Sequence, residues 1–246
     1  RRRLTQALDR TERSRMSKST PLPGYKTTKP AIPAIKSMFR ELGAQDACIQ
    51  LQELCAVYMQ NSAAATNAPL DAFLHLLYQG NGIPHGTLSF SELRQLSAKS
   101  YIVLTYALFE KMLLEVIDYV KSSIPGSAAA WVTKSATGGR LPPLLELAAN
   151  LPAAERQSLE GVPEFRLFEH YRAVRVANSH VVGNTANKAQ VAFGLLSNND
   201  LSHFTHCYEL QAPNPASDIT FQDFRLFTRA IKYYSRLVNE AARSAA

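Results

Sequence analysis

Apolar residues recur every three or four positions along most of the chain, which is the spacing of one buried face of an α-helix. No stretch alternates apolar and polar residues as a half-buried strand does. Residues 190–210 fit a helix and short extended segments equally well. The pattern predicts an all-α fold, with helices over residues 34–62, 70–78, 92–121, 144–150, 153–160, 164–184 and 218–238.

The predicted helix over 92–121 is the most apolar of the set, so it should lie at the centre of the fold. Ser91 is expected to cap its start, and Thr220 with Asp223 forms a capping pair for the last helix. The core candidates fall on the first and last helices: Met38, Leu42, Ile49, Leu51, Leu54, Val57 and Tyr58, then Phe224, Phe227, Ile231, Tyr234 and Val238.

The charge of the chain is concentrated at its start. The net charge is +7, and residues 1–18 carry seven basic and two acidic side chains, which leaves only +2 for the rest. The expected organisation is a basic arm with a proline-rich linker (1–33), an N-terminal helical region (34–89) and a larger helical domain (90–246). The charge of the arm is compatible with binding to RNA phosphates, to an acidic partner or to a membrane surface. It is equally compatible with a solvated, flexible segment that binds nothing.

Several classes of protein are excluded by composition. The apolar run from Tyr101 to Phe109 ends at Glu110, far short of the roughly 18 residues that span a bilayer, and no signal peptide is evident. Cys48 and Cys55 are expected to be small core residues, and with Cys207 they are too scattered for disulfides or a zinc site. A cytoplasmic protein without metal or cofactor is expected.

One predicted helix, from Glu164 to Asn184, combines a buried face with chemistry-bearing side chains. Phe168, Tyr171, Val174, Val181 and Val182 form its apolar sector, whereas its polar positions include Arg172, Arg175, Asn178 and His180. A guanidinium holds the charge of a phosphate, and an imidazole transfers protons near neutral pH. This pairing suits phosphodiester chemistry and suggests an RNA-cleaving site. The alternative for His180 is a structural role, in which the histidine lies at the end of the helix and only forms a hydrogen bond with the backbone.

The four-residue spacing between Arg175 and His180, followed by Gly183 and Asn184, resembles the defining motif of the HEPN superfamily of helical domains. Residues 97–120 and 218–238 look like the first core helix and the closing helix of such domains. The resemblance implies a HEPN-like bundle with extra N-terminal helices, acting as a metal-independent endoribonuclease on single-stranded or loop RNA. It also implies a toxin or host-defence role, a homodimer through the site helix, and an inhibitor as a further partner. A third interpretation is a larger assembly, in which the basic arm and the helices over residues 34–78 bind another subunit.

Helical geometry sets conditions on this site. At about 100° per residue, Arg175 and His180 point roughly 140° apart, whereas Arg172 lies roughly 80° from His180. Either the helix loosens before Gly183 or two protomers complete the site. Arg172 and Asn178 are therefore added as site candidates on geometry, although Arg172 is equally suited to a surface salt bridge with Glu169.

Glu110 is the last candidate. It shares a face of the central helix with Val103, Tyr106, Leu113, Leu114 and Ile117, where a carboxylate needs a partner. Arg172 or Arg175 is the expected partner, which would fix the guanidinium beside His180. The rival interpretation is a non-catalytic HEPN-like module that dimerises or binds a partner. Val176 directly after the arginine favours that rival, because many family members have a polar residue there.

Overall fold

A computed structural model describes residues 30–65, 69–84, 87–123, 130–179 and 185–246. Within these ranges the regular elements are helices, and one isolated antiparallel bridge joins Lys134 to Arg140. The all-α prediction is confirmed. The helices are α2 (Pro33–Ala65), α3 (Leu70–Gly80), α4 (Phe90–Ser123), α6 (Pro143–Asn150), α7 (Ala153–Glu160), α8 (Pro163–Ser179), α9 (Thr185–Gly194), α10 (Asn198–Tyr208) and α11 (Phe221–Ala245).

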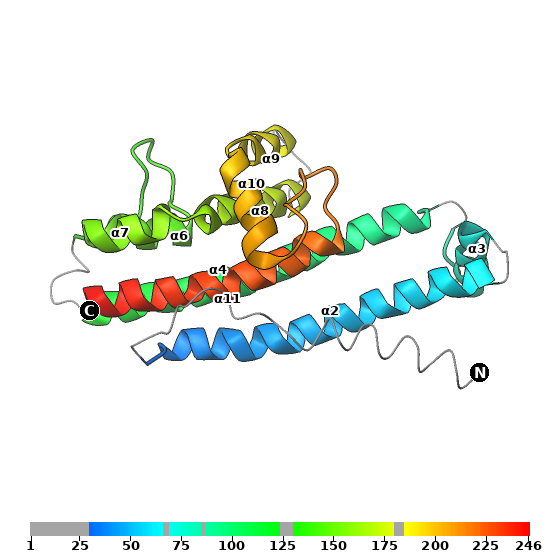
Figure 1. Cartoon of the computed structure of the whole chain (residues 1–246), viewed down its shortest axis with the longest axis horizontal. Coiled ribbons are helices and arrows are strands. Elements are labelled where there is room, and N and C mark those ends of the chain that lie inside the picture. Colours follow the sequence, from blue (N-terminus) through cyan, green and yellow to red (C-terminus); the bar gives the residue numbers. More distant parts are fainter. Residues whose placement is uncertain (1–29, 66–68, 85–86, 124–129, 180–184) are drawn as a thin grey trace.

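Three long helices, α2, α4 and α11, run beside one another along the molecule, with α6, α7 and α8 on the opposite side of α4 and α11 from α2 (Figure 1). The central place predicted for the helix over 92–121 is confirmed, because α4 contacts α2, α6, α8 and α11. The short helices α9 and α10 lie at the outer side of the bundle, where α9 packs against α8 and α10 contacts α11 (Figure 1).

An aromatic cluster fills the centre, where α4, α8 and α11 meet. The rings of Phe109 and Phe168 lie 4.7 Å apart, and the ring of Tyr234 lies 4.8 Å from that of Phe168. These three side chains are fully buried, as are the five residues predicted for the inner face of the last helix. This cluster fixes α8 against α4, which is the contact that positions the candidate site.

The prediction for the second half of α2 is wrong. Met38, Leu42 and Ile49 are buried as expected, but Leu51, Leu54, Val57 and Tyr58 are 62%, 55%, 38% and 73% exposed, and Cys48 and Cys55 are exposed as well. The reason is the position of α11, whose first turn lies near the middle of α2 (Figure 1). Beyond that point the helices in contact with the described residues of α2 are α4 and α3, and two neighbours cover only part of the surface of α2.

Of the two predicted helix caps, the structure confirms one and corrects the other. α4 is capped by Ser89 rather than Ser91: the Ser89 hydroxyl accepts a hydrogen bond from the Glu92 amide, and the Glu92 carboxylate accepts one from the Ser89 amide. The helix therefore begins at Phe90. The capping pair of Thr220 and Asp223 is present as predicted.

The unassigned stretch over 190–210 forms the end of α9 and the whole of α10, separated by a capping box at Ser197 and Asp200. Across the described ranges, no helix is both long enough and apolar enough to cross a bilayer.

Candidate functional site

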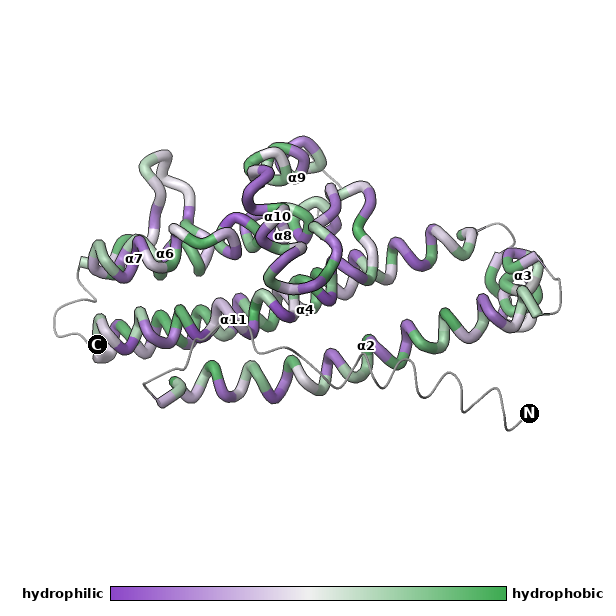
Figure 2. Tube along the Cα trace, viewed as in Figure 1, coloured by the Kyte–Doolittle hydropathy of each residue, from purple (hydrophilic) through white to green (hydrophobic). Residues whose placement is uncertain are grey.

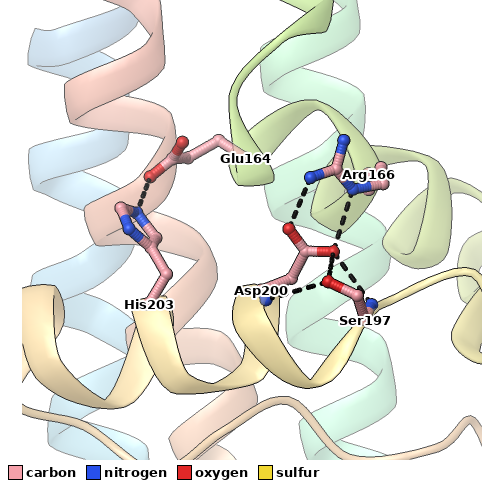
Figure 3. Close-up of polar contacts among 5 residues, drawn as sticks. All are labelled: Glu164, Arg166, Ser197, Asp200 and His203. Atoms are coloured by element: carbon pink, nitrogen blue, oxygen red, sulfur yellow. Dashed lines mark hydrogen bonds and ion pairs between the residues drawn. The ribbon is translucent and has the colours of Figure 1, made fainter.

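The site helix α8 is held at its start by two carboxylates that connect it to α10 (Figure 3). Arg166 of α8 donates from Nε to Asp200 Oδ2 at 2.9 Å, and Asp200 also caps α10 through Ser197. Glu164, which is almost fully buried, lies 2.9 Å from His203 Nε2. These contacts fix the direction in which α8 runs across α4.

Glu164 also accounts for the position of His203, one of two histidines on α10. Its Oε1 accepts a hydrogen bond from the Tyr208 hydroxyl at 2.7 Å in addition to its contact with His203. His206 instead lies 2.7 Å from the backbone carbonyl of Ser202 on its own helix. No group of three or more His, Cys, Asp or Glu side chains in the described ranges is arranged to hold a metal ion.

The central feature of the candidate site is an ion pair between α8 and α4. Arg175 Nη1 lies 2.6 Å from Glu110 Oε2, and the two side chains are 30% and 25% exposed. The predicted pairing of Glu110 with an arginine of the site helix is therefore present. Glu110 remains a quarter exposed, so water still reaches the edge of the pair.

Tyr106 forms the base of this pair. It is buried, its ring lies parallel to Phe227 at 6.0 Å, and the Arg175 guanidinium sits 5.6 Å from its centroid. That distance allows a cation–π interaction. Burial raises the pKa of Tyr106 well above its usual value, so the phenol stays neutral. The ring and the Glu110 carboxylate together hold the guanidinium in one place.

Arg172 forms the salt bridge with Glu169 that was its alternative in the sequence analysis. Its Nε and Nη2 donate to the Glu169 carboxylate at 2.8 to 3.2 Å, three residues earlier on α8. The Tyr106 hydroxyl lies in the field of both ion pairs, so Arg172 and Arg175 belong to one charged cluster. Asn178 donates to the carbonyl of Val174 at 2.7 Å, which ties its amide to its own helix.

His180 lies outside the described residues, together with Val181, Val182, Gly183 and Asn184. The structure thus brings Glu110 and Arg175 together and places Arg172 nearby. The approach of His180 to Arg175 stays a prediction.

A groove of about 710 Å³ between α8 and α9 adds residues that the sequence pattern did not reveal. On α8 it is lined by Glu169, Arg172, Ala173 and Val176, so it adjoins the charged cluster. Its other wall is formed by α9 and the residue that follows it, with one basic side chain among small, polar and apolar ones: Thr185, Asn187, Lys188, Gln190, Val191, Ala192 and Leu195. The helical spacing of Lys188 and Val191 indicates that both side chains lie on the same face of a helix. It could not be used to find the groove because the sequence pattern gave no helix assignment for this stretch.

Val176 has a structural explanation in this groove. It contributes apolar surface to the lining at the position where a polar residue was expected from the resemblance.

Comparison with family models, with curated proteins and with solved structures finds no match for this chain. Its function is therefore argued from its own residues.

Proposed function

We propose that this chain is a metal-independent endoribonuclease that cleaves single-stranded or loop RNA, with Arg175 and His180 as its catalytic residues. The observation that carries the proposal is the Arg175 guanidinium, held at the end of the site helix by Glu110 and Tyr106. RNA supplies its own nucleophile, the 2′-OH, so a protein needs only to move protons and to stabilise charge on the phosphate.

In this proposal Arg175 binds the scissile phosphate. A guanidinium has five N–H donors, and Glu110 engages one of its nitrogens at 2.6 Å. The remaining donors of a side chain that is 30% exposed can reach a phosphate at the surface. Glu110 acts as a positioning residue, because it holds the guanidinium before RNA binds and so removes an ordering cost.

His180 transfers protons in the proposed reaction. It removes the proton from the 2′-OH or donates one to the leaving 5′-oxygen, and the products carry a 2′,3′-cyclic phosphate and a 5′-hydroxyl. Arg175 stabilises the charge of the pentacoordinate phosphate. The groove beside Arg172 and Lys188 offers room for the adjoining nucleotides, with Val176 as an apolar contact.

The wider setting belongs to the same proposal. Two protomers meet through their site helices and bring two Arg175–His180 sets together, as the resemblance to HEPN domains implies. The protein then works in the cytoplasm as a toxin or defence effector, with an inhibitor or a larger assembly that restrains it.

The test is cleavage of a mixed RNA pool in excess chelator, with detection of 2′,3′-cyclic phosphate ends. His180→Ala should lower the rate by about 100-fold or more, as loss of a general acid or base does. Arg175→Ala should lower it by a similar factor. His206→Ala is the matched control, because that histidine bonds its own helix and should leave the rate unchanged. Full activity in His180→Ala, or loss of activity on chelation, contradicts the proposal.

A second candidate is a non-catalytic dimerisation or partner-binding module. It is favoured by the neutralisation of Arg175 by Glu110 and by the exposed apolar side chains of α2, α4 and α9. A purified chain that associates in solution but cleaves no RNA in the same assay selects this candidate.

A further inference from the structure

The end of the bundle formed by α2 and α4 has an apolar surface that none of the described helices covers. Residues 51–65 of α2 and 90–104 of α4 are called the two-helix end here. Figure 2 shows apolar positions continuing along α2 and into α3 past the start of α11. Leu51, Leu96 and Leu104 are 62%, 52% and 57% exposed and line a single groove of about 690 Å³. An exposed apolar surface of this kind marks an interaction site.

The groove combines two kinds of side chain. The protruding leucines alternate with small residues, namely Cys55, Ala56, Ser97 and Ser100. Protruding side chains of one helix pair fit into the spaces above small side chains of another. A surface that carries both the protrusions and the spaces can therefore pack against a copy of itself across a two-fold axis.

The charge of the two-helix end restricts its partner further. Residues 47–65 contain one charged side chain, Glu53, and it is paired with Arg94 of α4. Residues 90–104 contain Glu92, Arg94 and Lys99, so the two-helix end carries two acidic and two basic side chains and no net charge. A nucleic acid or a strongly charged protein finds almost nothing to pair with on this surface, whereas two copies of a nearly neutral surface do not repel each other.

We propose that the two-helix end is a homodimer interface, in which α2 and α4 of two copies pack as a four-helix bundle. Two helices side by side are about 20 Å wide, and fifteen residues of helix are about 22 Å long, so each face projects on the order of 450 Å². Two faces of this size give on the order of 900 Å² in total, below the roughly 1,200 Å² at which stable specific interfaces begin and within the range of weak, reversible ones. The dimer therefore dissociates at micromolar rather than nanomolar concentration.

This interface is distinct from a dimer through the site helix, and variants separate the two. Leu51→Lys and Leu104→Lys place a charge in the two-helix end. Val191→Lys places one on α9, beside the site helix, at a residue of matched exposure (66%). Each leucine is buried twice in a symmetric dimer, so either leucine variant should raise the dimer Kd by about 100-fold or more. Val191→Lys should leave the dimer Kd unchanged.

The measurement is sedimentation velocity of the full chain from about 1 to 100 μM, the range expected for an interface of this size. Circular dichroism of each variant checks that the helices persist, which the exposure of both leucines leads us to expect. A wild-type chain that is monomeric throughout contradicts the proposal. So does a dimer that Val191→Lys disrupts and both leucine variants preserve. A chain that dimerises only after removal of residues 1–29 shows that this segment covers the groove and also overturns it.

Discussion

The ion pair between Glu110 and Arg175 gives the most direct test of the site, because its strength follows from its burial. The perturbation is a double-mutant cycle of Glu110→Ala, Arg175→Ala and the combination. Each single change leaves its partner about 70–75% buried without a counter-charge, since the side chains are 25% and 30% exposed. The double change removes both charges, so the cycle isolates the interaction between them.

Two known limits bracket the coupling energy. Fully exposed pairs contribute about 0.2–1 kcal/mol, because water and salt screen them. Hydrogen bonds to charged groups with little solvent contact contribute about 1.5–3 kcal/mol. The short Nη1–Oε2 distance of 2.6 Å and the partial burial place this pair between the limits. We expect a coupling of about 1–2 kcal/mol in the free energy of unfolding.

The assay is urea unfolding followed by circular dichroism at pH 7, in low salt and in 1 M NaCl. The ion pair between Lys111 of α4 and Glu41 of α2 is the matched control, since those side chains are 56% and 39% exposed and 3.2 Å apart. The control should show a smaller coupling that salt abolishes, whereas the coupling of Glu110 with Arg175 should largely persist. A coupling of Glu110 with Arg175 no larger than the control refutes the view that this pair holds the guanidinium.

Three further predictions concern titration and capping. Burial lowers the pKa of His170 to about 4, so on acidification the unfolded chain binds a proton at this residue before the folded chain does. The free energy of unfolding should therefore fall by on the order of 3 kcal/mol as the pH falls from about 6.5 to 4. His170→Gln should lack this pH-dependent loss in urea titrations. Arg166 holds the pKa of Asp200 at about 2, so Asp200→Asn should be less stable than wild type at pH 5, with the difference vanishing as pH falls from about 4 to 2. Thr220→Ala should cost about 1 kcal/mol through the lost cap, measured by thermal unfolding against Thr205→Ala as an exposed control.

The sequence alone determined most of the helices and marked Glu110 as a carboxylate that needs a cation. The three-to-four spacing of large apolar residues predicted both ends of α4 and the start of α11 to within one turn, although α11 continues past Val238 to Ala245. It also marked Phe224, Phe227 and Tyr234 as core. Glu110 was marked in the same way, because a carboxylate on an apolar helix face needs a cation. These predictions succeed because local periodicity and the cost of burying charge act in every arrangement of the helices.

Only the tertiary structure decided which apolar faces are covered and which arginine takes which carboxylate. Leu51 and Tyr58 have the spacing of core residues, yet they are exposed, because α11 begins too far along the bundle to cover them. Arg175 rather than Arg172 meets Glu110, because the packing of α8 on α4 turns that position toward Tyr106. Helical periodicity fixes the face of a residue, but the length and placement of neighbouring helices determine what that face meets.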